Sequence, residues 1–327
     1  MHKLVGIAMS AIVAVASVVA FSARPEPAFP PTQIKSDKLL VSGIDVNASG
    51  AAAAGDIGTV LVSTDQGRTW HPAKTSPGGE SVESVESALT RLHFVDASHG
   101  FSVGQDQSIL KTEDGGKSWT RVHVASDRAE PLFDLYASAG GQLFAVGAFG
   151  AFLESGDAGR TWNAREIGVE DAHLYGIAGR GDKLLIAGEQ GLVARSVDGG
   201  RHWTTVPKFY GGSFFGALAL SQGKWLVYGM RGRVYISDAD MLSWQEIPTH
   251  LNAALYGGTQ LRDGRVVLVG QGGAIALSDP GVQSFATLHA GARGSYSDVR
   301  EMHDGSLLLA GETGIAVDKA ILNAKQP

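Results

Sequence analysis

One eight-residue phrase, Ser/Thr-x-Asp-x-Gly-x-x-Trp, occurs four times in this chain of 327 residues, and its copies begin at Ser63, Thr112, Ser155 and Ser196. A second phrase, Gly-x-x-Gly, stands shortly before it and also occurs where the first has decayed. It occurs seven times if a degenerate copy at Gly104 is counted, and its first glycines are 49, 43, 41, 41, 41 and 41 residues apart. A regular period of this length indicates that one structural unit is repeated along the chain.

Each unit contains four short apolar runs. In the unit over residues 174–207 these runs begin at Leu174, Lys183, Gly191 and His202, and turn-forming residues separate them. None is long enough for a regular helix, and four short strands in a unit of about 40–45 residues are typical of a propeller blade. The sequence therefore predicts an all-β fold, a single seven-bladed β-propeller of four-stranded antiparallel blades.

The longer phrase predicts a staple between the third and fourth strands of a blade. Its aspartate can accept backbone N–H groups of the turn, its glycine permits positive φ, and its tryptophan can pack between blades. We therefore assign a structural role to Asp65, Trp70, Asp114, Trp119, Asp157, Trp162, Asp198 and Trp203. The fifth and sixth units keep the frame of the phrase but lose its aspartate and glycine.

The seventh unit ends after its third strand, so the ring needs a fourth strand from elsewhere. We expect the N-terminal segment around residues 29–36 to supply it and so to close the ring. Residues 319–327 are the alternative donor.

The N-terminus predicts export. Residues 1–23 have a short basic start followed by an uncharged apolar run, and they are either a cleaved signal peptide or an N-terminal membrane anchor. Residues 24–38 form a proline-rich spacer and the expected closing strand, and residues 39–327 form the propeller. The predicted location is the periplasm, with a tether to the inner membrane if the first segment is not cleaved.

The composition and the absence of known motifs exclude several classes of function. The net charge is −6 and there is no cysteine, so neither a basic nucleic-acid patch nor a disulfide framework is expected. The histidines lack ligand spacing, so no metal is expected. No catalytic motif and no cofactor motif is present, and we expect a protein that is not an enzyme and has no cofactor.

Binding is expected on the Gly-x-x-Gly turns, because propellers hold such turns and the loops before each first strand on one face. The turn tips carry acids, amides, one arginine and exposed apolar residues, a mixture that turn geometry does not require. The predicted partner-binding residues are Asp56, Gln105, Asp106, Phe149, Glu189, Gln190, Arg231, Arg233, Gln271, Arg293 and Glu312. Phe209, Tyr210 and Phe214 in a long loop extend this face.

Aromatic residues recur where first strands begin. They are Phe133, Tyr175, Phe215, Tyr256 and Tyr296. We expect them to form core between blades, with an aromatic ligand cage as the alternative.

The repeated phrase is the Asp-box, or BNR repeat, and residues 39–318 as a whole resemble the photosystem II stability/assembly factor-like family of seven-bladed propellers. The resemblance implies a non-catalytic scaffold or assembly factor for a membrane-protein complex of the cell envelope. The expected partner is an inner-membrane or periplasmic protein complex, such as a transporter, and the ring is expected to be monomeric. In that family an arginine patch contributes to binding, and the nearest candidates here are Arg195, Arg231, Arg233 and Arg293.

The alternative function is a glycan-binding or glycoside hydrolase propeller, because sialidases also carry Asp-boxes. Sialidases resemble this chain in the boxes only. The Arg-Ile-Pro motif that they place ahead of the first box has Arg24-Pro25 as its nearest match here, and that match fails.

Overall fold

The computed structural model describes residues 39–76, 87–125, 130–138, 140–169, 171–289, 291 and 294–319. All of them belong to the larger of the chain's two compact units, Lys35–Pro327. The predicted signal or anchor, the spacer, the closing strand at residues 29–36 and the rival donor beyond residue 319 fall outside the described residues, as does Arg293.

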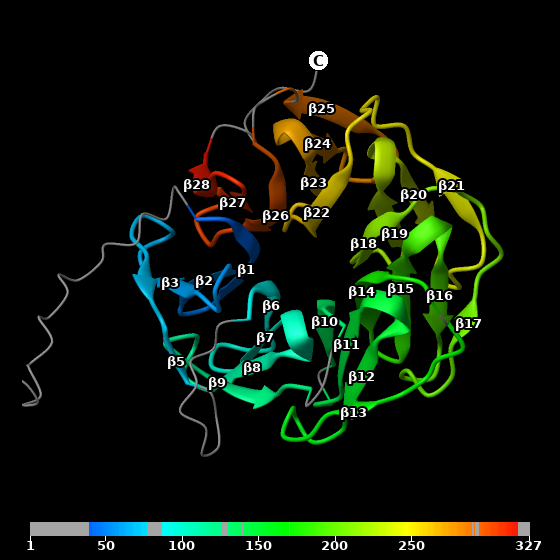
Figure 1. Cartoon of the computed structure of the whole chain (residues 1–327). Coiled ribbons are helices and arrows are strands. Elements are labelled where there is room, and N and C mark those ends of the chain that lie inside the picture. Colours follow the sequence, from blue (N-terminus) through cyan, green and yellow to red (C-terminus); the bar gives the residue numbers. More distant parts are fainter. Residues whose placement is uncertain are drawn as a thin grey trace, which may run out of the picture. The chain divides into compact units, whose positions relative to one another are not determined.

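The described residues form seven antiparallel sheets around a central opening (Figure 1). Except for one added strand, β5, the strands of each sheet follow one another in sequence order, and the first strand of each blade lies at the opening (Figure 1). The predicted all-β, seven-bladed architecture with four-stranded blades is therefore confirmed.

Each of the first four blades has four strands in simple meander order, and one added strand, β5, joins blade 2. Blade 1 comprises β1 (Val41–Asn47), β2 (Gly50–Gly55), β3 (Val60–Ser63) and β4 (His71–Pro72). Blade 2 comprises β6 (Leu89–Phe94), β7 (Gly100–Gly104), β8 (Ile109–Thr112) and β9 (Ser118–His123), with β5 (Lys74–Ser76) at its rim. Blade 3 comprises β10 (Leu132–Ala137), β11 (Leu143–Gly147), β12 (Phe152–Ser155) and β13 (Asn163–Ala164). Blade 4 comprises β14 (Leu174–Arg180), β15 (Lys183–Gly188), β16 (Val193–Ser196) and β17 (Thr204–Thr205).

The last three blades follow the same order. Blade 5 comprises β18 (Phe214–Ala219), β19 (Trp225–Gly229), β20 (Val234–Ser237) and β21 (Trp244–Glu246). Blade 6 comprises β22 (Leu255–Gln260), β23 (Val266–Gly270), β24 (Ile275–Ser278) and β25 (Phe285–His289). Blade 7 comprises β26 (Tyr296–Glu301), β27 (Leu307–Gly311) and β28 (Gly314–Asp318), with no fourth strand among the described residues.

Short 3-10 turns occupy the Gly-x-x-Gly phrase in five blades. They are η1 (Gln105–Gln107), η2 (Ala148–Gly150), η3 (Glu189–Gly191), η4 (Met230–Gly232) and η5 (Gln271–Gly273). Across the described part of the chain, no helix has the length and apolar character needed to span a membrane.

Strand β5 is a feature that the repeat does not predict. The chain leaves the rim of blade 1 and pairs in parallel with β9 of blade 2, with Lys74 opposite Ser118 and Ser76 opposite Thr120. Blade 2 is thus a five-stranded sheet that is tied to blade 1 by main-chain hydrogen bonds.

The core lies between the blades. The second strands are almost wholly buried, and one hydrophobic cluster joins Ala178 and Leu185 of blade 4 to Trp225 and Val227 of blade 5. Because each blade buries one face against its neighbour, the ring is stable only as a whole.

The predicted staple is present. In blade 3 Asp157 accepts the backbone N–H groups of Arg160 (3.0 Å) and Thr161 (2.9 Å), and Ser155 accepts that of Gly159 (2.9 Å). These bonds, led by the backbone N–H of Thr161, lower the pKa of Asp157 to about 2. Trp119 is 1% exposed and packs in a cluster shared by blades 1 and 2, which confirms the inter-blade role of that side chain.

The decayed boxes keep their turns by other means. Met241 and Val282 replace the box glycine, yet both hold positive φ (57° and 53°) and bury their side chains. In blade 6 the segment that corresponds to the box begins at Ser278. The next residue, Asp279, accepts the backbone N–H groups of Gln283 and Ser284 (2.8 and 2.7 Å). The turn conformation is therefore retained in blades that have lost the Asp-box sequence.

Each inner strand contains a register irregularity at its second residue. In blade 3, for example, Leu132 pairs with Gly147 and Asp134 with Val146, so that Phe133 is left between two pairs. A bulge of this kind re-aims the side chain of the extra residue. The bulged residues are Ser42, Thr90, Phe133, Tyr175, Phe215, Tyr256 and Ser297.

Candidate interaction face

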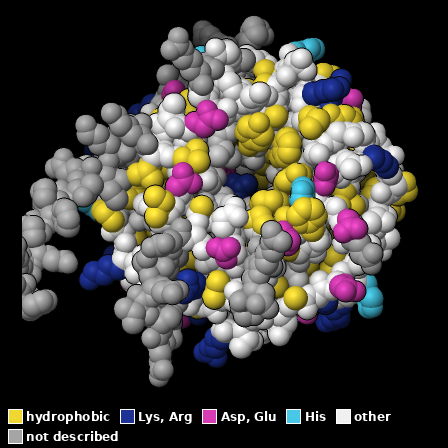
Figure 2. Space-filling view, in the orientation of Figure 1, with side chains coloured by type: hydrophobic (Ala, Val, Ile, Leu, Met, Phe, Trp, Pro, Cys, Tyr) yellow, Lys and Arg dark blue, Asp and Glu magenta, His cyan; other side chains and the backbone are white. Residues whose placement is uncertain are grey.

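We define the Gly-x-x-Gly face as the end of the ring that carries the seven turns between second and third strands and the starts of the inner strands. The Asp-box turns, between third and fourth strands, lie at the opposite end because the strands are antiparallel. Figure 2 shows hydrophobic side chains gathered around the central opening, with Lys or Arg visible in its depth.

The second tip residue of the turn is left-handed in six blades. Five of these residues are not glycine, and they are Ile57, Asp106, Phe149, Gln190 and Arg231, with φ between 50° and 57°. A left-handed conformation costs a non-glycine residue about 1–2 kcal/mol. The scaffold thus holds these side chains outward, and Phe149 is 58% exposed and Ile57 74% exposed.

The first tip residue forms a structural hydrogen bond in three blades. The side chains of Glu189, Gln271 and Glu312 accept the backbone N–H group of the residue that precedes the inner strand of the same blade, at 3.3, 3.3 and 3.2 Å. Those predicted partner-binding residues therefore also fasten the turn to the inner strand.

The remaining predicted tips are dispersed around the ring. Asp56 and Gln105 lie at the turns of blades 1 and 2, and Asp106 accepts a hydrogen bond from Ser87 at 2.8 Å. The tips alone do not form one compact site.

The candidate arginines do not meet in one patch among the described residues. Arg233 pairs with Glu246 of the rim strand β21. Arg195 donates from Nη1 to the backbone oxygen of Asp240 (3.0 Å), in a turn of the opposite face. Arg231 is exposed at its tip and forms no ion pair with the described residues, so it is the one of the three that is free to face outward on the Gly-x-x-Gly face.

The loop aromatics pack inward. Phe214 is fully buried, and Phe209 stacks on Trp244 with ring centroids 5.3 Å apart. Tyr210 contacts Phe214 and donates to the backbone oxygen of Met230 at 3.2 Å. The prediction that these aromatics extend the binding surface is therefore wrong for Phe214, which is buried, whereas Tyr210 is partly exposed.

An arc of aromatic rings follows the bulge position across blades 3 to 6. Ring centroids are 5.4 Å apart between Phe133 and Tyr175, 5.2 Å between Tyr175 and Phe215, and 5.5 Å between Phe215 and Tyr256. All four rings pack between neighbouring blades but remain partly exposed. They are therefore more accessible than the fully buried core that the sequence predicts.

Tyr296 is not part of this series. It precedes the bulge and pairs with Gly311, the position at which the other blades have leucine, Val41 or Phe214. In blade 7 the bulge residue is Ser297, whose hydroxyl donates to the backbone oxygen of Val41 at 2.6 Å.

His173 joins the arc to a turn tip. Its ring lies 4.6 Å from that of Phe149 and 5.8 Å from that of Tyr175 between centroids. Its Nδ1 accepts the backbone N–H of Phe149 at 3.1 Å. We call Phe133, Phe149, His173, Tyr175, Phe215 and Tyr256 the aromatic arc.

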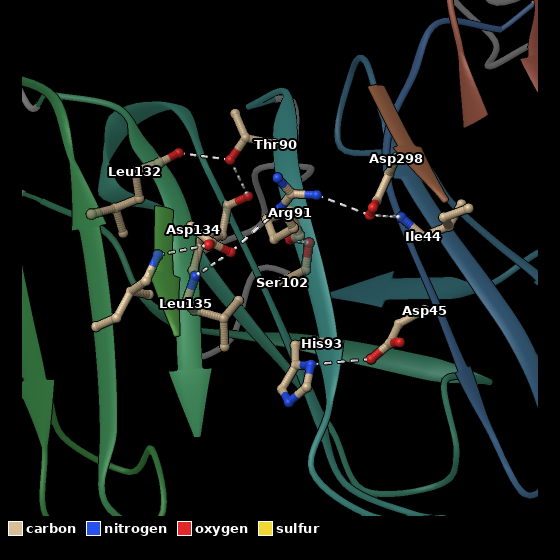
Figure 3. A network of polar contacts seen from close by, with 12 residues as sticks. Ile44, Asp45, Thr90, Arg91, His93, Ser102, Leu132, Asp134, Leu135 and Asp298 are labelled. Carbon is tan, nitrogen blue, oxygen red and sulfur yellow. Dashed lines mark hydrogen bonds and ion pairs between the residues drawn. The ribbon is translucent and has the colours of Figure 1, made fainter. Parts of the chain in front are cut away.

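The residue after the bulge differs in charge from blade to blade. Four blades have glycine there, and three have the charged residues Arg91, Asp134 and Asp298. Arg91 contacts Asp298 (2.9 Å) and Asp134 (3.4 Å), as Figure 3 shows. These charged residues therefore come from blades 7, 2 and 3, and blade 3 contributes to both the charged set and the aromatic arc.

Further contacts extend this network. Arg300 contacts Asp298 (2.6 Å) and Asp45 (3.1 Å), and His93 contacts Asp45 (3.2 Å). The network borders a cavity of about 250 Å³ in the opening. Tyr228 also lines this cavity, and burial raises its pKa.

Two carboxylates here test the glycoside hydrolase alternative. Burial raises the pKa of Asp134 although Arg91 opposes the rise. However, Asp134 accepts the N–H of Ile177 (2.9 Å) and Asp298 that of Ile44 (3.2 Å), and the Asp298 side chain is fully buried. Both carboxylates thus join neighbouring blades.

No cluster of three His, Cys, Asp or Glu side chains suited to a metal ion occurs in the described parts of the chain. The sequence analysis missed the charged network, and in the arc it named four of the bulge aromatics and Phe149 but not His173, which connects them. Arg91, Asp134 and Asp298 each stand 13 residues before the first glycine of their unit, so aligning the units on that glycine places them at one shared position.

Comparison with known proteins supports the same family as the sequence. The family model described as "Photosynthesis system II assembly factor YCF48" matches residues 80–134 and 130–314, and the BNR/Asp-box repeat model matches residues 61–72. The photosystem II stability/assembly factor HCF136 of Oryza sativa subsp. japonica is 30% identical over 122 residues, which are 35% of this chain and 29% of that protein. The match therefore spans less than a third of the length of this curated relative.

Solved structures show the same fold. "YCF48 bound to D1 peptide" superposes with a TM-score of 0.69 at 16% identity, over 90% of this chain and 99% of that one. YCF48 from Cyanidioschyzon merolae gives 0.66 at 14% identity, over 86% and 95%. The WD40 propeller of Doa1 gives 0.67 at 15% identity, over 86% and 93%, so similarity at this level reports the fold alone. Because the family model covers most of the ring, this chain belongs to the YCF48 family of photosynthesis system II assembly factors.

Proposed function

We propose that this protein is a non-catalytic, exported assembly factor that holds a segment of a membrane-protein complex of the cell envelope on its Gly-x-x-Gly face. The observation that carries the proposal is Phe149. It is 58% exposed at positive φ (50°), at a tip that contacts the aromatic arc. A scaffold that holds an aromatic side chain outward in an unfavourable conformation is suited to binding a protein.

Family membership supports an assembly role. A curated relative is named as a stability/assembly factor, and a YCF48 structure of the same fold is described as bound to a peptide. We extend peptide binding to this chain as part of the proposal. The partner is an inner-membrane or periplasmic complex, and the ring acts either free in the periplasm or tethered through its N-terminal segment.

The test is purification of a tagged full-length protein from crosslinked cells, with the membrane and soluble fractions analysed separately by mass spectrometry. The proposal predicts a stoichiometric membrane protein in the membrane fraction. Recovery of the protein alone, together with hydrolysis or binding of a glycan by the purified ring, would instead support the glycan-active alternative.

A further inference from the structure

The wall of the central cavity contains a phenol that the fold itself does not use. Tyr228 of β19 is 3% exposed, yet its hydroxyl forms no hydrogen bond with any residue that the structure describes. It lines the cavity of about 250 Å³ in the opening. Because burial of a hydroxyl without a partner is unfavourable, a cavity wall with such a group is suited to a ligand that supplies the partner.

Glycines allow two phenols to reach this cavity. Tyr228 pairs with Gly216 of the inner strand and lies against it, since an added Cβ at Gly216 would lie 2.3 Å from the Tyr228 hydroxyl oxygen. Tyr136 of β10 lies in the same way against Gly179 of blade 4, where a Cβ would lie 2.3 Å from the Tyr136 Cζ. The Tyr136 hydroxyl also lines the cavity and has no hydrogen-bond partner within the described parts of the chain.

The charges that border the cavity are nearly balanced. The wall carries Arg91, Arg300, His93 and Asp134. The two guanidinium groups contact three carboxylates between them, and His93 adds a positive charge only when it is protonated. An anion in the cavity would therefore meet carboxylates, and a cation would meet guanidinium groups, so the network favours a neutral occupant.

The volume and the polar groups of the cavity narrow the class of occupant further. Pockets for drug-sized ligands have volumes of about 300–1,000 Å³, so this cavity suits a smaller molecule. A hydroxyl group both donates and accepts, and it can pair with a phenol, a guanidinium group or the Asp134 carboxylate. Small apolar residues, among them Ala178, Ala217 and Ala219, complete the wall and can contact C–H groups. A compact neutral molecule that is rich in hydroxyl groups meets all of these conditions.

We propose that the central cavity binds a single neutral sugar ring, whose hydroxyl groups form hydrogen bonds with Tyr136 and Tyr228. The inference concerns binding alone and assigns no reaction. It adds a small-molecule site inside the ring to the protein-binding face, and it does not rest on the proposed function.

The test measures binding of monosaccharides to the purified full-length protein by saturation-transfer NMR and titration calorimetry. Glucose, galactose and mannose are the neutral probes. The uronic acid and the amino sugar of each are matched probes that add one negative or one positive charge. At least one neutral probe should bind, and it should bind more tightly than both of its charged analogues.

The source of the sugar ring is distinguished by a second pair of probes, the disaccharides maltose and lactose. Binding of a disaccharide would support the inference with the end of a glycan chain as the ligand. Binding of monosaccharides alone would support it with a free sugar as the ligand.

Tyr228→Phe locates the site, because it removes only the hydroxyl. Sugar affinity should fall about twofold to tenfold, the worth of one hydrogen bond. The urea midpoint of the ring should not fall, since the hydroxyl has no partner among the described residues. Tyr235→Phe is the matched control. Tyr235 lies on the neighbouring strand β20 and donates to Glu246 at 3.4 Å, and it does not line the cavity, so its substitution should leave sugar affinity unchanged.

Tyr136→Phe tests the second phenol from another blade. It should also weaken sugar binding about twofold to tenfold. Tyr175→Phe is its control, since Tyr175 belongs to the aromatic arc and does not line the cavity.

Absence of binding by every probe, or tighter binding of a charged analogue than of its neutral parent, would overturn the inference. So would equal effects of the cavity variants and their controls. Co-purification with a membrane protein tests the proposed function independently, so the two proposals can fail separately.

Discussion

Arg91 of blade 2 contacts Asp298 of blade 7 at 2.9 Å, and so reaches past blade 1 at the junction where the first and last blades meet. Asp298 in turn accepts the backbone N–H of Ile44 in blade 1 at 3.2 Å. One carboxylate thus ties three blades together (Figure 3). Within the described residues, closure of the ring relies on this polar network as well as on packing of β1 against β26.

Arg91→Ala should strongly destabilise the ring. The substitution leaves Asp134 without its cation and Asp298 with Arg300 alone, and removal of one partner from a buried ion pair costs about 3–5 kcal/mol. Urea unfolding measures the loss of unfolding free energy. Arg68→Ala, at an exposed box arginine, is the control and should remain within about 0.5 kcal/mol of the parent. A loss as small as that of the control would show that the network does not stabilise the ring.

Acid should destabilise the ring through Asp45. Burial alone would raise the pKa of Asp45, but the hydrogen bond and charge of His93, the charge of Arg300 and the Phe94 N–H lower it from 3.8 to about 2. A carboxyl whose folded pKa is below its unfolded value stabilises the fold above the unfolded pKa. That contribution, about 2 kcal/mol, should be lost as pH falls from about 4 to about 2.

Asp45→Asn isolates this contribution, because the raised pKa of Asp134 acts in the opposite sense and remains in both proteins. The free-energy difference between parent and variant, measured by urea unfolding at each pH, should shrink on acidification. A difference that stays constant over this range would contradict the assignment.

The box tryptophans should differ in their contribution to stability. Trp119 is 1% exposed and lies 6.2 Å from Phe94 between ring centroids, so Trp119→Ala should cost about 3–5 kcal/mol through the cavity it leaves. Trp70 makes the same Nε1 bond to its box glycine but is only partly buried, and Trp70→Ala should cost clearly less. Thermal unfolding of the two variants makes the comparison, and equal losses would be inconsistent with burial as the cause.

The donor of the missing outer strand can be identified by truncation. Strand β28 has no partner on its outer edge among the described residues. Removing residues 24–38 should lower the urea midpoint of the ring if the N-terminal segment closes it, whereas removing residues 320–327 should not. The reverse result would assign the closing strand to the C-terminal residues.

The sequence predicted the architecture because the box and the Gly-x-x-Gly phrase satisfy local requirements of turns, which recur in every blade. It could not predict β5, because the pairing of Lys74 with Ser118 depends on where the rim of blade 2 lies in space. Tyr296 shows a second limit of prediction from the sequence. It was grouped with the aromatic bulge residues, but it lies one residue before the bulge, and a shift of one residue in a strand moves a side chain to a different environment.

The charged network could not be predicted from the sequence for a related reason. Arg91, Asp134 and Asp298 stand where other blades have glycine, and a repeat search treats such replacements as decay. Their meaning appears only when the ring brings blades 2, 3 and 7 to one opening. The tips were located correctly, but the sequence does not distinguish Glu189, which fastens a strand, from Gln190, which faces outward.

The most direct test of the proposed function is photo-crosslinking in intact cells from two positions of blade 4. Gln190 lies at the tip on the Gly-x-x-Gly face, and Arg201 lies in the box turn at the opposite end, and both are exposed. A crosslinkable residue at 190 should capture a single membrane protein, and the same residue at 201 should not. Capture from 201 alone, or no membrane protein from either position, would contradict the assignment of this face to a membrane-protein partner.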